Sequence, residues 1–157
     1  MFRWKDYDPC HYEPSKLEAL VKAYQKLISE KWLSEPDNLF GRWWENEYFV
    51  LKTSRVREIG FDAAKSVILE FEWMKSMPAI VLSSYGIYFN GNCGGVVVFS
   101  PEYGENLGWG DKYGFTGKMI LLSRGACLPW TPTGTASRLI RQSLRQLPRQ
   151  YEVITAT

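Results

Sequence analysis

The sequence is short of the residues that build disulfide frameworks and metal sites. It has three cysteines and one histidine among 157 residues, and no two cysteines form a Cys-x-x-Cys pair. An odd number of widely spaced cysteines argues against a disulfide-stapled secreted domain and favours a reducing compartment. Cys10 and His11 are adjacent possible ligands, but the sequence has no partner pair for them, so they are a weak metal signal. We therefore expect a cytoplasmic protein and assign no metal site.

Long apolar runs and a strong charge of one sign are also missing. No stretch approaches the roughly 20 apolar residues that span a bilayer, and the N-terminus lacks the pattern of a signal peptide. We therefore expect no membrane partner. The formal net charge of +2 is too small for the field of the whole molecule to indicate nucleic acid, so such a partner must be argued from local clusters.

What the sequence does contain predicts one globular domain with an N-terminal elaboration, because 45% of its residues are hydrophobic and 15% aromatic. Residues 1–50 are expected to form a helical and aromatic extension, and residues 51–157 the core. Ser15–Glu18 has the pattern of a capping box, and apolar residues repeat at helical spacing across residues 16–32. The aromatic residues between Phe40 and Leu51 either pack this helix on the domain or stack on a partner.

A second amphipathic helix is predicted from Ala63 to about Met74, with Asp62 as its N-cap. Its inward face consists of Ala64, Val67, Ile68 and Phe71. Glu72 falls near the C-terminal end, where the helix dipole disfavours a carboxylate. This position makes Glu72 a candidate acid, base or metal ligand, and the alternative interpretation is an ordinary solvated glutamate.

A β-hairpin and a long loop follow this helix. The strands Tyr85–Phe89 and Gly95–Phe99 flank Asn90-Gly91, which is the strongest short hairpin signal, with a loop of two residues or one that extends through Gly94. Residues 101–117 then hold five glycines and four aromatic residues. This loop is either functional, as a lid or as a platform on which Trp109 and Tyr113 stack an unpaired base, or an Ω-loop packed on its own aromatic side chains.

The last part of the chain predicts a pocket for an anion. A strand, Lys118–Ser123, leads through a turn-rich passage to a helix, Ser137–Leu147, and then to a strand, Tyr151–Thr155. A small-residue turn before a helix N-terminus can hold a phosphate through backbone N–H groups and the helix dipole. Apolar residues occupy one stripe of this helix, namely Ala136, Leu139, Ile140, Leu144 and Leu147.

Arginines occupy the other side of the same helix, at Arg138, Arg141 and Arg145. One interpretation is a surface that follows the phosphates of DNA, and the other is a solvated helix face. Spacing alone leaves both interpretations open.

The predicted order of elements resembles the core of the GNAT family of N-acetyltransferases, an α+β fold with a mixed sheet and flanking helices. In that family the turn carries Arg/Gln-x-x-Gly-x-Gly/Ala and binds the pyrophosphate of acetyl-coenzyme A. Thr131–Ala136 matches at Gly134 and Ala136 and departs at Thr131. The resemblance implies acetyl-coenzyme A or a related acyl donor, bound by Thr133, Gly134, Thr135, Ala136, Ser137 and Arg138.

Four runs also resemble the phage-borne Mom family, namely Phe71–Pro78, Tyr85–Phe99, Leu122–Trp130 and Thr135–Arg141. The similarity covers roughly residues 57–157. Proteins of that family are acetyltransferase-like enzymes that modify adenine in phage DNA to an N6-carbamoylmethyl form, which blocks restriction enzymes. The resemblance implies DNA as a partner and the bacterial host cytoplasm as the location.

Carried over by position, the resemblance implies catalytic roles for Arg124, Ser137 and Glu72. Glu72-Trp73 occupies the place of a His-Tyr pair thought to help hold iron, so the implied iron site lacks its histidine. Adenine N6 is reached by flipping the base into a pocket, and we assign DNA contacts to Arg141, Arg145, Trp109 and Tyr113.

The family continues with a helix and two more strands, whereas this sequence stops at Thr157. The resemblance therefore implies a partial core without those elements. The unpaired edge of Tyr151–Thr155 predicts a second chain or subunit that covers it. Two other functions remain open: a non-catalytic phage interaction protein or host-defence inhibitor on the same scaffold, and a small-molecule N-acyltransferase.

Overall fold

The computed structural model describes residues 49–102 and 118–156 and the isolated positions 26, 30, 108, 112 and 114, with only the backbone given for 152–156. The predicted N-terminal helix over residues 16–32 lies outside this part of the chain apart from positions 26 and 30, which are helical. Trp109 and Tyr113 lie outside it too. Among the described residues, no helix has both the length and the apolar character needed to cross a membrane.

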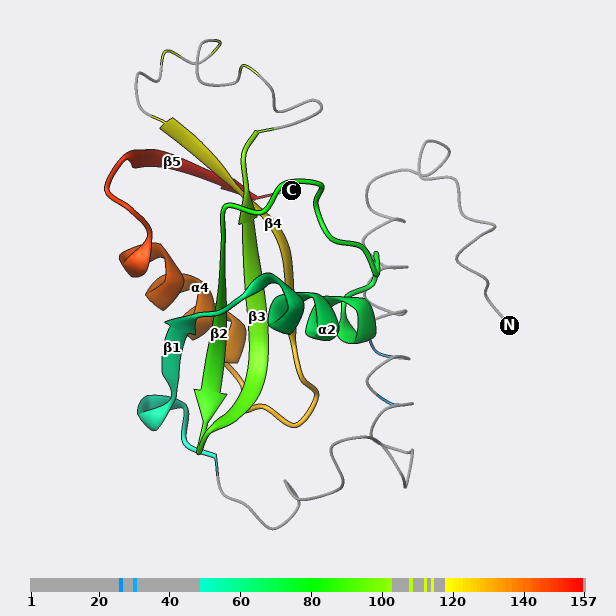
Figure 1. Ribbon diagram of the computed structural model, residues 1–157. Coiled ribbons are helices and arrows are strands. Elements are labelled where there is room, and N and C mark those ends of the chain that lie inside the picture. The colour runs from blue at the N-terminus through cyan, green and yellow to red at the C-terminus, as the bar shows by residue number, and fades with distance from the viewer. Residues whose placement is uncertain are drawn as a thin grey trace.

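The described chain is an α+β fold in which a five-stranded sheet is flanked by helices (Figure 1). The predicted order of strand, helix, hairpin, strand, helix and strand is confirmed. The elements are η4 (Leu51–Thr53), β1 (Arg55–Glu58), α2 (Phe61–Phe71), β2 (Ser83–Phe89), β3 (Asn92–Ser100), β4 (Lys118–Cys127), α4 (Thr135–Gln146) and β5 (Tyr151–Ala156).

The strands follow one another across the sheet in sequence order, β1-β2-β3-β4-β5. The first three pairings are antiparallel, whereas β4 and β5 are parallel and are joined through α4. β5 pairs with β4 only from Lys118 to Leu122. The rest of β4, Ser123–Cys127, therefore has no strand partner among the described residues on that side, and the sheet has an open notch there.

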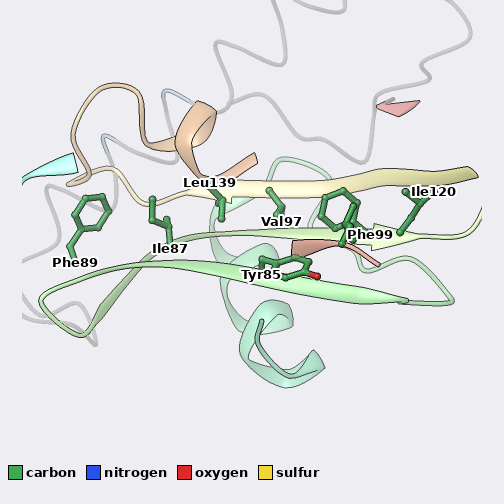
Figure 2. Packing of buried hydrophobic residues seen from close by; sticks show 8 residues of the cluster. Tyr85, Ile87, Phe89, Val97, Phe99, Ile120 and Leu139 are labelled. Atoms are coloured by element: carbon green, nitrogen blue, oxygen red, sulfur yellow. The ribbon is translucent and has the colours of Figure 1, made fainter. Parts of the chain in front are cut away.

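The two helices cover opposite faces of the sheet. Successive side chains of a strand point to opposite faces, and the two helices pack against different residues of β3. On one face α2 packs against Val96 and Val98. On the other face Leu139 of α4 packs with Val97 and Phe99. Figure 2 shows this second cluster as a row of apolar side chains that follows the sheet.

The predicted inward face of α2 is confirmed, since all four of its apolar residues are buried. The helix bounds differ from the prediction, because α2 begins at Phe61 and ends at Phe71. Gly60 is the N-cap, and its carbonyl accepts the first helical hydrogen bond from Ala64. Asp62 lies in the first turn, where a carboxylate complements the dipole without capping the helix.

The turn Asn90-Gly91 joins β2 directly to β3, because Phe89 pairs with Asn92. Its two residues have φ angles of 49° and 89°, as the two-residue hairpin turns with positive φ require. The longer loop considered above is therefore wrong. Gly94 lies within β3 at a bulge, since Tyr88 pairs with Cys93 and Ile87 with Gly95.

α4 begins two residues earlier than predicted, at Thr135, and its buried face is different. Leu139 and Leu147 are buried, and Ile140 and Leu144 are partly buried against the same cluster. Ala136 is exposed, and Ser143 is buried instead. The Ser143 hydroxyl donates to the carbonyl of Leu139 at 2.8 Å, which is how a polar residue fits a packed helix face.

Gly95→Ala is expected to lower the free energy of unfolding by about 1–3 kcal/mol. A Cβ at position 95 would lie 2.7 Å from the carbonyl oxygen of Ala126 and 3.0 Å from the Cα of Cys127. Both are backbone atoms of β4, so the two strands must separate. Gly125→Ala is the matched control, since its Cβ would meet nothing closer than 3.4 Å. Equal urea midpoints for the two variants would contradict this account.

Candidate functional site

A cavity of about 340 Å³ lies along the outer edge of β4, at the notch where β5 stops pairing. Its walls come from both faces of the sheet, because the sheet is interrupted there. The lining residues are Glu72 and Trp73 after α2, Val96 and Val97 of β3, Leu122–Cys127 of β4, and Ala136, Leu139 and Ile140 of α4. We call this the β4 cavity.

The backbone of β4 forms one wall of the β4 cavity. From Arg124 to Cys127 one edge of the strand pairs with β3, and the other edge borders the cavity without a strand partner among the described residues. An open edge presents N–H and C=O groups to which an extended ligand with amide groups can add. The cavity therefore offers strand-like hydrogen bonding together with apolar side walls.

Arg124 is fixed beside this edge by hydrogen bonds to the chain itself. Its Nε donates to the carbonyl of Ser76 at 2.9 Å, and its Nη1 donates to the carbonyl of Ser123. The predicted end of the strand at Ser123 is wrong, because Arg124 pairs with Val98 and β4 continues to Cys127. The guanidinium is thereby held between the β4 cavity and a neighbouring cavity of about 370 Å³ that includes Glu102.

Glu72 lines the β4 cavity as the C-cap residue of α2 and is only 6% exposed. Its Oε2 accepts a hydrogen bond from the backbone N–H of Met74 at 2.9 Å. Burial raises the pKa of Glu72 above its ordinary value, and the Met74 N–H and the charge of Arg124 offset part of that rise. The interpretation as a solvated glutamate is therefore wrong, and the carboxyl is a candidate acid or base.

The turn before α4 is built from left-handed backbone and threonine hydroxyls. Gly134 is the N-cap with φ 90°, and the Thr135 hydroxyl donates to the carbonyl of Pro132 at 2.6 Å. The predicted start of the helix at Ser137 is wrong, since Ser137 is the third helical residue and has an exposed side chain. The helix N-terminus consequently lies at Gly134 and Thr135, with Ala136 on the cavity wall.

Aromatic packing holds this turn against the hairpin. The ring of Trp130 lies 4.7 Å from that of Phe49 and 5.7 Å from that of Phe89, between centroids. A Cβ at Gly94 would come within 2.8 Å of both Phe89 and Thr131. The glycine at the bulge therefore allows the turn to approach β3, a contact between distant segments that no local pattern in the sequence announces.

The three predicted arginines of α4 do not share one environment. Arg138 Nε donates to the Ser54 hydroxyl at 2.8 Å, and its Nη2 donates to the carbonyls of Lys52 and Ser54 at 3.0 and 3.1 Å. This guanidinium ties α4 to the segment before β1. The side chains of Arg141 and Arg145 are exposed.

The predicted catalytic and cofactor-binding residues thus divide into two groups. Glu72, Arg124 and Ala136 line one cavity, although they are far apart in the sequence. The side chains of Thr133 and Ser137 are exposed. The side chain of Arg138 points to the segment before β1, and its backbone N–H donates to the carbonyl of Gly134. These three residues do not line the β4 cavity.

Cys127 is a lining residue that the sequence analysis did not identify. Burial, together with the neighbouring Cys93, raises the pKa of the Cys127 thiol to about 11. Only the thiolate is nucleophilic, so Cys127 forms an apolar part of the wall at neutral pH. In the sequence, the position of Cys127 after an apolar strand is the feature that could have indicated its place in the cavity wall.

Within the described ranges, no three His, Cys, Asp or Glu side chains gather as metal ligands. At the place of the implied iron site, Glu72 offers one carboxylate, and Trp73 has no atom that ligates a metal. These residues do not fit an iron centre, and we assign no step of chemistry to one. Cys10 and His11 lie outside the described residues.

No family model and no curated protein matches the sequence. Several solved structures are similar to the chain, including the following three. A possible acetyltransferase from Clostridium difficile 630 is 8% identical, with a TM-score of 0.46 over 66% of this chain and 78% of that one. A ribosomal-protein-alanine N-acetyltransferase from Brucella melitensis biovar Abortus 2308 is 13% identical, with a TM-score of 0.46 over 67% and 80%.

The third similar structure is an aminoglycoside N-acetyltransferase in complex with CoA. It is 15% identical, with a TM-score of 0.43 over 66% of this chain and 78% of that one. Likenesses of this size carry no argument about substrate or residue roles. The comparisons do not support the resemblance to the Mom family.

Proposed function

We propose that the β4 cavity binds an acyl-coenzyme A and that the protein transfers the acyl group to an amine. One observation carries this proposal: the open edge of β4 and the N-terminus of α4 border the same cavity. An extended arm with amide groups suits an open strand edge, and a pyrophosphate suits a helix N-terminus. A coenzyme A thioester combines both features.

The first turn of α4 is suited to hold the pyrophosphate through its backbone. The N–H groups of Ala136 and Ser137 have no hydrogen-bond partner among the described residues, whereas that of Arg138 donates to the carbonyl of Gly134 at 3.0 Å. The left-handed Gly134 leaves these amides accessible, because it carries no side chain. Thr133–Ser137 would therefore form the anion cradle, with the dipole of α4 behind it.

Glu72 and Arg124 are suited to handle the acceptor amine. An acyl-coenzyme A supplies an activated carbonyl carbon. The amine nitrogen forms a C–N bond to this carbon, the C–S bond of the thioester breaks, and coenzyme A leaves as a thiolate that takes up a proton. The amine nitrogen must lose a proton in the same reaction. A carboxylate whose pKa is raised by burial accepts a proton more readily than an ordinary glutamate. In this proposal Glu72 takes the proton of the amine. The positive charge of Arg124, which is held by Ser76, offsets part of the rise in the pKa of Glu72.

Calorimetry with acetyl-coenzyme A tests the proposal. Ala136→Phe places a ring at the exposed start of α4, on the cavity wall, and is expected to weaken binding about tenfold or more by filling the space the ligand needs. Ala63→Phe is the matched control, since Ala63 is an exposed residue in the first turn of α2. No binding by the wild-type protein, or equal weakening in both variants, would refute the assignment.

A second candidate acceptor is the N6 amine of adenine in DNA. The exposed Arg141 and Arg145 favour it, since they lie on the helix whose N-terminus borders the β4 cavity and can contact phosphates. Mass spectrometry of nucleosides from cells that express the protein would decide the matter. Unmodified adenine throughout would exclude this acceptor.

The non-catalytic alternative remains separate from both acceptors. An interaction protein built on this scaffold would bind no acetyl-coenzyme A in the same calorimetric experiment. The predicted partner at the edge of β5 stays a prediction, which solution scattering would contradict by showing a monodisperse monomer.

A further inference from the structure

A second cavity, of about 420 Å³, lies at the opposite edge of the sheet from the β4 cavity. It is lined by Thr53, Arg55, Arg57, Tyr88, Asn90 and Gly91, and we call it the β1 pocket. β2 and β3 separate its strand from β4 (Figure 1). None of its residues has a role in the acyl transfer proposed above.

The side chains of the β1 pocket form a cationic and aromatic surface. Arg55 and Arg57 are two residues apart on β1, so they project from the same face of the sheet. Arg55 pairs with Tyr88 across the strands, and the guanidinium carbon of Arg57 lies 4.1 Å from the centroid of the Tyr88 ring. Both arginines are exposed. A guanidinium over an aromatic ring and a second, adjacent guanidinium therefore border the same cavity.

No carboxylate balances these charges within the described residues. Neither Arg55 nor Arg57 makes a salt bridge there, and no Asp or Glu lines the pocket. The nearest acidic residue along β1 is Glu58, which alternation places on the opposite face with Val56, and Val56 packs on the α4 side. An uncompensated pair of positive charges in a concave site attracts anions.

We propose that the β1 pocket binds a phosphate group carried by a nucleotide, either free or within a single strand of nucleic acid. A guanidinium donates paired hydrogen bonds that match phosphate oxygens, so Arg55 and Arg57 would hold the phosphate. The Arg57–Tyr88 stack would receive the base, because bases stack on aromatic rings and guanidinium planes. The proposal does not depend on the acyltransferase function.

Three ligands separate the sources of the phosphate: a fluorescent single-stranded thymidine oligonucleotide, AMP and inorganic phosphate, each titrated against the full chain at low salt. Arg55→Gln/Arg57→Gln is expected to weaken phosphate-dependent binding about tenfold or more. If both arginines contact phosphates of the oligonucleotide, the salt dependence of log K also becomes shallower by about 1.4. Tyr88→Leu is expected to weaken binding of AMP and the oligonucleotide but leave inorganic phosphate unchanged.

Lys65→Gln/Lys118→Gln is the control, because it also removes two exposed positive charges but lies outside the β1 pocket. Its affinity should stay within about twofold of wild type, as expected for distant surface charges. Binding of the oligonucleotide alone would identify a nucleic-acid strand, and binding of AMP as well would identify a nucleotide site. The proposal is overturned if no ligand binds, or if the control loses as much affinity as the arginine variant.

Thermal unfolding of each variant would show whether the substitution leaves the fold intact. Unchanged acetyl-coenzyme A binding by Arg55→Gln/Arg57→Gln would show that the two sites are separate. If this variant lost phosphate binding and kept acetyl-coenzyme A binding, the loss would be assigned to the β1 pocket and not to the β4 cavity.

Discussion

Glu72→Gln is expected to lower kcat for acyl transfer by about 10²- to 10⁴-fold, the usual contribution of a general base. Glutamine keeps the shape of the side chain and an oxygen that can accept the Met74 N–H, but it cannot take a proton from the amine. The affinity for acetyl-coenzyme A should change little, because the proposed donor contacts are made by β4 and α4. Steady-state kinetics with an acceptor amine, together with calorimetry, would measure both effects.

Glu70→Gln is the matched control, since Glu70 is an exposed glutamate on the same helix. Its kcat should equal that of wild type. If Glu72→Gln retained full activity, the base would have to be another group, and the role given to Glu72 would be wrong.

The pH dependence of kcat for the wild-type protein and for Glu72→Gln provides a second check. Because burial raises the pKa of Glu72, wild-type kcat should increase with pH through a midpoint above the ordinary glutamate value of 4.5. The residual activity of Glu72→Gln should lack this step. A wild-type midpoint at or below the ordinary value would contradict the buried state of the carboxyl.

Stability should respond to pH in the opposite direction. Between the unfolded pKa of Glu72 and its raised folded pKa, the folded protein binds more protons than the unfolded chain, so stability falls as pH rises through that window. Glu72→Gln removes this contribution. Relative to wild type, the variant should therefore be more stable at a pH above the window than at a pH below it. Urea titrations of both proteins at these two pH values would show the difference.

Phe99→Ala is expected to lower the free energy of unfolding by about 3–5 kcal/mol. Phe99 is fully buried in the cluster between the sheet and α4, and its ring lies edge-on to that of Tyr85 at 6.0 Å (Figure 2). It also pairs with Leu122, the last residue of β4 that β5 covers. Truncation would leave a cavity beneath the helix that borders the proposed acyl-donor site.

Phe61→Ala is the control for the loss of an aromatic ring, since Phe61 is 46% exposed at the start of α2. Its cost should stay near or below about 1 kcal/mol, as for most surface substitutions. Guanidinium unfolding of both variants would measure the difference. Similar costs would mean that Phe99 is not packed as the structure shows.

Several elements could be predicted from the sequence because their causes are local. Asn90-Gly91 adopts positive φ at little cost and therefore fixes the hairpin turn. The spacing of Ala64, Val67, Ile68 and Phe71 fixes the buried face of α2, because these residues share one side of a helix. The order of strands and helices follows from the same periodicities.

Other features depended on contacts between distant segments. β4 extends to Cys127 because Gly125 and Ala126 pair with β3, although Arg124 and Gly125 locally resemble a strand end. Glu72 is buried because the chain turns at the end of α2 beside β4. Arg138 donates a hydrogen bond to Ser54, a residue far from it in the sequence.

The sequence by itself therefore determined the elements of this protein and the residues able to carry chemistry. The tertiary structure decided which of them meet. Glu72, Arg124 and Ala136 line one cavity only because β5 leaves the edge of β4 at Leu122. Arg55, Arg57 and Tyr88 form the β1 pocket only through the pairing of β1 with β2. Local periodicity specifies each strand, whereas long-range pairing and burial set the edges and cavities between them.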